Sequence, residues 1–83
     1  MPSVTKLQEE YDTLQRELKN VKMPSPVLKA RVKVFMRSVG AAFAANNEVV
    51  AQQNPRGNAL VSIRKENKCL TKMLTFCETV LNQ

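Results

Sequence analysis

Among the residues of this sequence, two regularly spaced sets of basic side chains are the best indication of a ligand-binding surface. One set recurs at every fourth position within residues 26–53, and the other recurs in the same way within residues 58–81. Because side chains four residues apart share one face of an α-helix, each set should form a positive row. Such rows suit the phosphates of a polyanion. The residues assigned to this nucleic-acid-binding surface are Lys29, Lys33, Arg37, Arg56, Arg64, Lys65, Lys68 and Lys72.

The charge of the chain favours the same interpretation. It has 13 Lys and Arg against 7 Asp and Glu, and its net charge is +6. Basic and acidic residues balance within residues 1–22, so the whole excess lies in residues 23–83. Together the two rows would extend on the order of 30 Å, about one turn of a duplex. We therefore expect contacts with the backbone of duplex RNA or DNA rather than readout of base sequence.

Catalysis and metal binding lack their usual residues in this chain. There is no histidine, which removes the commonest general base and transition-metal ligand. Cys69 and Cys77 cannot form a standard zinc site without further ligands. Gly40 and Gly57 stand too far apart to build a glycine-rich phosphate loop. We expect a protein without catalytic residues, metal or cofactor.

Cysteine spacing and hydropathy indicate a compartment. Cys69 and Cys77 would lie ~12 Å apart along one helix, too far for a disulfide within the chain. Reduced thiols are typical of the cytosol. The first residues form no apolar run like that of a secretory signal, and no apolar segment approaches the ~18 residues of a membrane span. We expect a cytoplasmic protein, with membrane binding disfavoured.

Proline and glycine divide the chain at residues 23–26 and 54–58. These breaks predict a single domain, residues 1–83, with helices at about 3–22, 26–53 and 58–81. Ser25 is expected to cap the second helix, with Pro26 at its first position. Asn58 is expected to cap the third helix.

Apolar residues recur at alternating steps of three and four in all three segments. This heptad pattern predicts an all-α fold, a three-helix antiparallel (up-down-up) bundle with short connections. The seam positions are Val4, Leu7, Tyr11, Leu14, Leu18 and Val21; Leu28, Val32, Phe35, Val39, Ala42, Asn46 and Val49; and Leu60, Ile63, Asn67, Leu70, Leu74, Cys77 and Leu81.

The two polar residues on these seams test the register. If the second turn folds the chain back on itself, the numbers of facing residues add to about 112–113, and Asn46 then faces Asn67. Two facing amides can satisfy each other and fix the register. The alternative is that one of them faces solvent.

Further apolar residues flank the seams and suggest self-association. The second helix adds Met36, Phe43 and Val50, and the third adds Met73 and Val80. An apolar flank left uncovered on a small protein usually marks an interface, so we expect these five residues to form a homodimer or larger oligomer. The alternative is that a twisted three-helix core uses both flanks itself.

In outline, this short basic helical chain resembles the small helical double-stranded-RNA-binding proteins that some RNA viruses use against host silencing. The shared features are the hairpin of the last two helices and the outward basic residues Arg56, Arg64, Lys68 and Lys72. The likeness is architectural, and no diagnostic motif accompanies it. It implies duplex binding by a dimer and a role as a viral or phage suppressor of host defence.

Two functions therefore stand against each other. The first is phosphate-mediated binding of nucleic acid by a homodimer. The second is a protein-binding helical module, such as an inhibitor, adaptor or assembly factor, which would use the apolar flank of the second helix or the N-terminal coiled-coil helix. A basic amphipathic helix on an anionic membrane is a weaker third hypothesis, because the most basic helices also carry the seams that should pack together.

Overall fold

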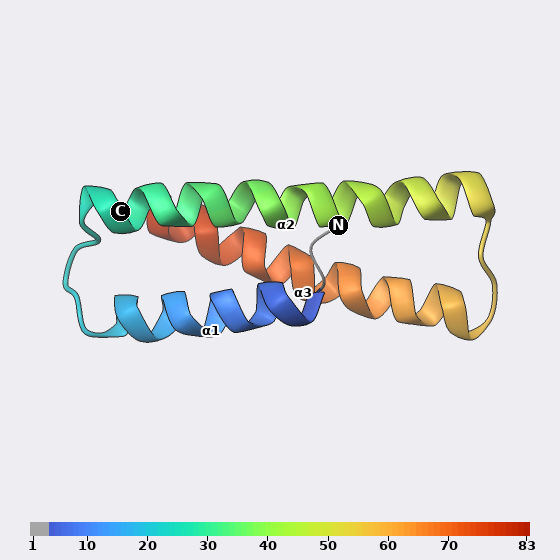
Figure 1. The fold of residues 1–83 in the computed structure, drawn as a ribbon, viewed down its shortest axis with the longest axis horizontal. Helices are drawn as coiled ribbons and strands as arrows, with labels where there is room; N and C mark the ends of the chain where they lie inside the picture. Colours follow the sequence, from blue (N-terminus) through green and yellow to red (C-terminus); the bar gives the residue numbers. More distant parts are fainter. Residues whose placement is uncertain (1–3) are drawn as a thin grey trace.

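The computed structural model describes residues 4–83, which form three α-helices and no strand. They are α1 (Val4–Lys19), α2 (Pro26–Gln53) and α3 (Asn58–Leu81), shown in Figure 1. The prediction of an all-α chain is confirmed. Ser3, the first residue of the predicted N-terminal helix, lies outside the described residues.

The bounds of α2 and α3 coincide with the expected ranges, but α1 ends at Lys19, three residues before the predicted end. Asn20 follows as an exposed turn residue, and asparagine is a residue type that favours turns over helix interiors. Val21 N donates to Leu18 O at 3.3 Å in a final turn. The Val21 side chain is 40% exposed, so its assignment to the buried seam is wrong.

The two predicted caps have different outcomes. Ser25 Oγ accepts a hydrogen bond from Leu28 N at 3.2 Å and caps α2, as expected. At α3 the prediction is wrong, because Gly57 rather than Asn58 holds the N-cap position and no side chain caps the helix. The tight connection explains this difference. Asn54 (φ 49°) and Gly57 (φ 64°) both adopt positive φ, which these two residue types tolerate best.

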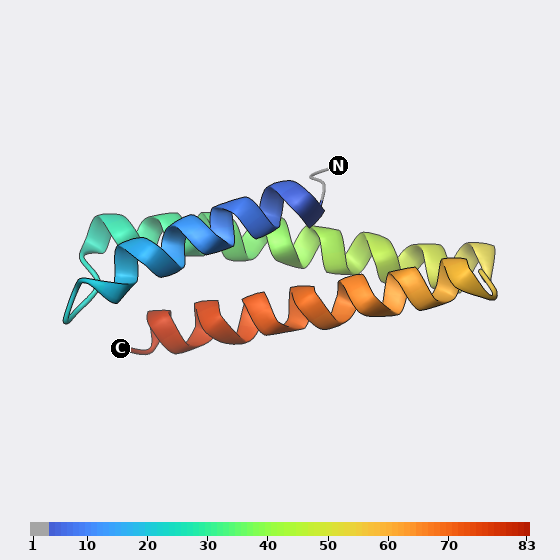
Figure 2. The ribbon, with the colours of Figure 1, turned by 90° about the horizontal axis from the view of Figure 1, so that it is seen from below.

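The three helices pack into an elongated molecule of 44 × 19 × 17 Å. α3 runs beside α2 over most of its length, whereas the shorter α1 lies against the half of α2 that begins at Pro26 (Figures 1 and 2). The core lies where all three helices meet. Its buried residues are Leu7, Tyr11, Leu14, Val32, Phe35, Val39, Ala42, Leu70, Met73, Cys77 and Val80.

Tyr11 is the side chain that joins α1 to both other helices. Its ring stacks on Phe35 of α2, with centroids 6.3 Å apart, and meets Phe76 of α3 edge-on at 5.1 Å. Aromatic pairs in such geometries add about 0.5–1.5 kcal/mol beyond the area that they bury. Tyr11 therefore contributes much of the packing that holds α1 against α2 and α3.

A layer of amides lies between α2 and α3 beyond the reach of α1. Asn46 Nδ2 donates to Asn67 Oδ1 at 3.0 Å and to Glu66 Oε1 at 3.2 Å, and Asn67 Nδ2 donates to Asn47 Oδ1 at 3.3 Å. The predicted Asn46–Asn67 pair is confirmed. Lys29 Nζ also donates to Gln83 O at 2.7 Å, and these two residue numbers add to 112, within the predicted range of 112–113.

We expect Asn46 and Asn67 to stabilise the fold as a pair. Replacing Asn67 with Ala leaves a half-buried amide without its partner, which should lower the free energy of unfolding by about 1–2 kcal/mol. Urea unfolding of N46A, N67A and the double variant forms a cycle in which differences in helix propensity cancel, and the coupling should be about 0.5–1.5 kcal/mol. Ser62→Ala, at an exposed position of α3, is the control and should shift stability by no more than about 0.5 kcal/mol. A coupling near zero would show that the pair contributes nothing.

Candidate nucleic-acid interface

The eight predicted nucleic-acid-binding residues lie at the surface of the α2–α3 hairpin. Lys29 is half-buried, because its ammonium group donates to the carbonyl of Gln83. The seven exposed members are Lys33, Arg37, Arg56, Arg64, Lys65, Lys68 and Lys72.

The register of the hairpin sets the levels of these charges along its axis. The Asn46–Asn67 bond pairs positions whose numbers add to 113. By the same register, Lys72, Lys68 and Arg64 stand at the levels of α2 residues 41, 45 and 49. The α2 row ends at Arg37, so the α3 row begins one helical turn beyond it. The two rows therefore continue each other over about 30 Å, at roughly 6 Å per step.

These charges are not neutralised by neighbouring carboxylates. Within residues 4–83 the one salt bridge joins Arg31 to Glu17, and both side chains are substantially exposed. The seven exposed members of the basic surface make no side-chain hydrogen bond or ion pair with another described residue. Their charges are thus available to an external anion.

Hydroxyl groups beside the basic rows are already engaged as donors. Thr71, Thr75 and Thr79 each donate from Oγ1 to the carbonyl four residues earlier, at 2.8, 3.0 and 2.9 Å. A hydroxyl that bonds back to its own helix has no second proton for a phosphate oxygen. On this face the free hydrogen-bond donors are therefore those of the exposed lysines and arginines.

The predicted oligomer interface is partly occupied within one chain. Met73 is 1% exposed and Val80 is 5% exposed, and both lie in the core, so their assignment to an open flank is wrong. Met36 and Phe43 are half-buried against that core, and Val50 is half-buried near the end of α2. α3 uses its flank because α1 joins the hairpin on one side. Because α3 packs against both α2 and α1, it buries residues beside its seam as well as residues on it.

The two cysteines differ in environment. Cys69 is exposed and Cys77 is buried, and both are free thiols. Burial, with a smaller contribution from the nearby carboxylate of Glu78, raises the pKa of the Cys77 thiol to about 11. Cys77 is therefore a core residue without nucleophilic character near neutral pH.

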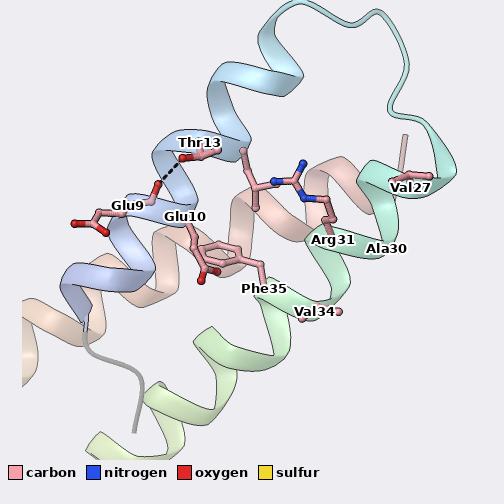
Figure 3. A pocket seen from close by; sticks show the side chains of 9 residues that line it. Glu9, Glu10, Thr13, Val27, Ala30, Arg31, Val34 and Phe35 are labelled. Carbon is pink, nitrogen blue, oxygen red and sulfur yellow. Dashed lines mark hydrogen bonds between the residues drawn. The ribbon is translucent and has the colours of Figure 1, made fainter.

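A groove between α1 and α2, with a volume of about 730 Å³, was not anticipated from the sequence (Figure 3). Val27 and Val34 of α2 form one wall, while Glu9, Glu10 and Thr13 of α1 form the other. Thr13 Oγ1 donates to Glu9 O at 3.0 Å and so is turned back to its own helix. The valines, seven residues apart and off the seam, are the sequence signal that could have predicted it.

Nothing in this groove resembles a catalytic or metal centre. Its titratable groups are Glu9, Glu10 and Arg31, and the arginine is paired with Glu17. Among residues 4–83, no three His, Cys, Asp or Glu side chains are grouped so as to hold a metal ion. The groove thus combines an apolar wall on α2 with a carboxylate-bearing wall on α1.

Comparisons with protein families, with curated proteins and with solved structures give no match for this chain. Within the described helices, none combines the length and apolar character needed to cross a membrane.

We expect one of the two thiols to react in the folded protein. At pH 8 a thiol with a pKa of about 11 is almost wholly protonated, whereas the exposed Cys69 meets the reagent directly. Intact-mass analysis with a maleimide should show one adduct on the native protein and two in denaturant. C69S should give none until it is unfolded, and C77S should react like the native protein. Rapid labelling of folded C69S would contradict the buried position of Cys77.

Proposed function

We propose that this chain is a non-enzymatic protein that binds duplex nucleic acid, RNA or DNA, through its phosphates. The observation that carries this proposal is the basic surface on α2 and α3, whose exposed cations have no partner among the described residues. Clustered cations of this kind gain free energy by releasing the counterions that a duplex condenses.

The geometry of the surface suits a duplex better than a compact anion. Its charges step along the hairpin for about 30 Å, which matches one helical turn of a duplex. The hairpin is also rigid support, because the amide layer and the aliphatic seam hold α2 and α3 in one register. The surface consists of cations that suit phosphates, so we expect it to contact the nucleic-acid backbone rather than base edges. Binding would then depend on the shape and charge of the duplex.

We infer further that the three helices act as one up-down-up bundle and that the protein works as a homodimer. A chain of 83 residues buries a thin core, and association is the usual way to add buried surface. Two free thiols suit a reducing compartment such as the cytoplasm. Suppression of host defence by sequestering duplex RNA is the biological role that this combination best fits.

A protein-binding module is the second candidate, and the groove between α1 and α2 is the observation that favours it. Its apolar wall includes Val27 and Val34, which are 71% and 61% exposed. Such a surface suits an amphipathic helix. The two functions are separable, because one depends on the cations of α3 and the other on the valines of α2.

We expect the α3 cations to be essential for duplex binding. Replacing Arg64, Lys68 and Lys72 together with Ala should weaken binding of a 20-base-pair RNA duplex at least 100-fold at low salt, because three phosphate contacts are lost. Fluorescence anisotropy measures the affinity, and circular dichroism checks helicity.

The matched control removes the same charge from another helix. Arg16, Lys19 and Lys22, at the end of α1 and just beyond it, are all exposed, and their replacement with Ala also removes three charges from the net +6. This control should bind within about threefold of the native protein, since only screened long-range attraction changes. Equal losses in both triple variants would show that net charge alone drives binding. Undiminished affinity of the α3 variant would overturn the proposal.

The salt dependence should count the phosphate contacts. A plot of log affinity against log salt is expected to be linear, and Lys68→Ala should reduce the magnitude of its slope by about 0.9, one counterion-release contribution. Titrations between about 50 and 300 mM NaCl measure it. Glu78→Gln, an exposed change on the same helix, should leave the slope unchanged. A native slope near zero would be incompatible with phosphate binding.

A further inference from the structure

α2 has a second apolar face that no other part of the chain covers. Heptad-spaced positions on this face are exposed, in contrast to the buried seam residues Val32, Phe35 and Val39. Val27 is 71% exposed and Val34 is 61% exposed, the largest values for valines in the described chain. The residues that define this outer face are Val27, Val34, Arg37, Ala41, Ala44 and Glu48.

The charges on the outer face are placed symmetrically. Arg37 and Glu48 lie at equal distances in sequence from the midpoint between Ala41 and Ala44. Two α2 helices that cross antiparallel at the alanines would therefore place Arg37 of each copy opposite Glu48 of the other. The same two-fold arrangement forms both pairs at once, which is the self-complementarity that an isologous interface requires.

Both charged groups are free to form these pairs. Arg37 has no side-chain partner among the described residues. Glu48 Oε1 accepts a hydrogen bond from Gln52 Nε2 at 3.1 Å, which leaves the other carboxylate oxygen for a guanidinium.

We propose that a second copy of this chain covers the outer face of α2, with the two α2 helices antiparallel and crossing at Ala41 and Ala44. Small residues at the crossing let the helix axes approach to about 8 Å. In this register Val34 faces Ala51 of the other copy, and the two helices overlap for about 30 Å. Val27 faces the connection at residues 54–58, which covers the α2 wall of the groove.

The dimer itself is argued without reference to nucleic acid. Its consequence for duplex binding rests on the proposed function. The two-fold axis stands perpendicular to the plane of the paired α2 helices, so each hairpin presents the same side in the same direction. The basic surfaces of both copies then lie side by side and form one larger positive face. Arg37 is assigned to the dimer, and the phosphate contacts to the other basic residues.

Charge reversal tests the pairing without nucleic acid. Arg37→Glu alone places four carboxylates at the interface, and Glu48→Arg alone places four guanidinium groups there. Like charges that face each other should raise the dimer dissociation constant about 100-fold in either single variant. The double variant R37E/E48R restores both pairs with the native net charge and should dimerise within about fivefold of the native protein.

Sedimentation equilibrium reports the mass of each variant against a monomer of 9.4 kDa, and circular dichroism reports helicity. If a single variant loses helicity, Ala44→Lys, which places a cation at the crossing itself, replaces it in the comparison. A dimeric native protein, weakened single variants and a restored double variant support the proposal. A monomeric native protein at about 0.5 mM would overturn it, as would a dimer that ignores the reversals. Duplex binding by anisotropy is a separate readout, so a native dimer that fails to bind RNA would overturn the proposed function alone.

Discussion

The antiparallel register of α2 against α3 is the constraint on which the rest of this structure depends. Apolar seams alone would specify the register only weakly, because apolar residues recur along both helices at the same spacing. The Asn46–Asn67 hydrogen bond at 3.0 Å singles out one register, since a shift would bury an amide against aliphatic carbon. The level of every cation on the hairpin follows from that choice. So does the meeting of the helices at Tyr11.

α1 has a different kind of attachment. It reaches only the half of the hairpin that begins at Pro26, and its buried residues are Leu7, Tyr11 and Leu14. The aromatic contacts of Tyr11 with Phe35 and Phe76 compensate for this short contact. Where α1 ends, α2 is left with an uncovered side. A long central helix with a shorter neighbour therefore leaves surface that a partner can use.

The surface of the molecule divides into a charged part and an apolar part. The seven exposed residues of the basic surface form no ion pair with a carboxylate of the described chain, whereas the outer face of α2 is mainly valine and alanine. The two properties are compatible, because α2 presents different faces to α3 and to solvent. A duplex on one side and a second copy on another would use both without competition. Arg37 lies at the border between them, and the proposed dimer would pair it with Glu48 of the second copy instead of a phosphate.

The heptad pattern determined the three helices and the Asn46–Asn67 pair, because the period of a helix and the lengths of two short turns fix which residues face each other. The same pattern also indicated the basic rows. It placed Met73 and Val80 on an open flank, and it could not show that α1 joins the hairpin on the side where α3 buries them. Likewise Phe76, off every seam, became a partner of Tyr11. Periodicity reports which face of a helix is apolar, whereas only tertiary packing decides which neighbour covers that face and which part remains exposed.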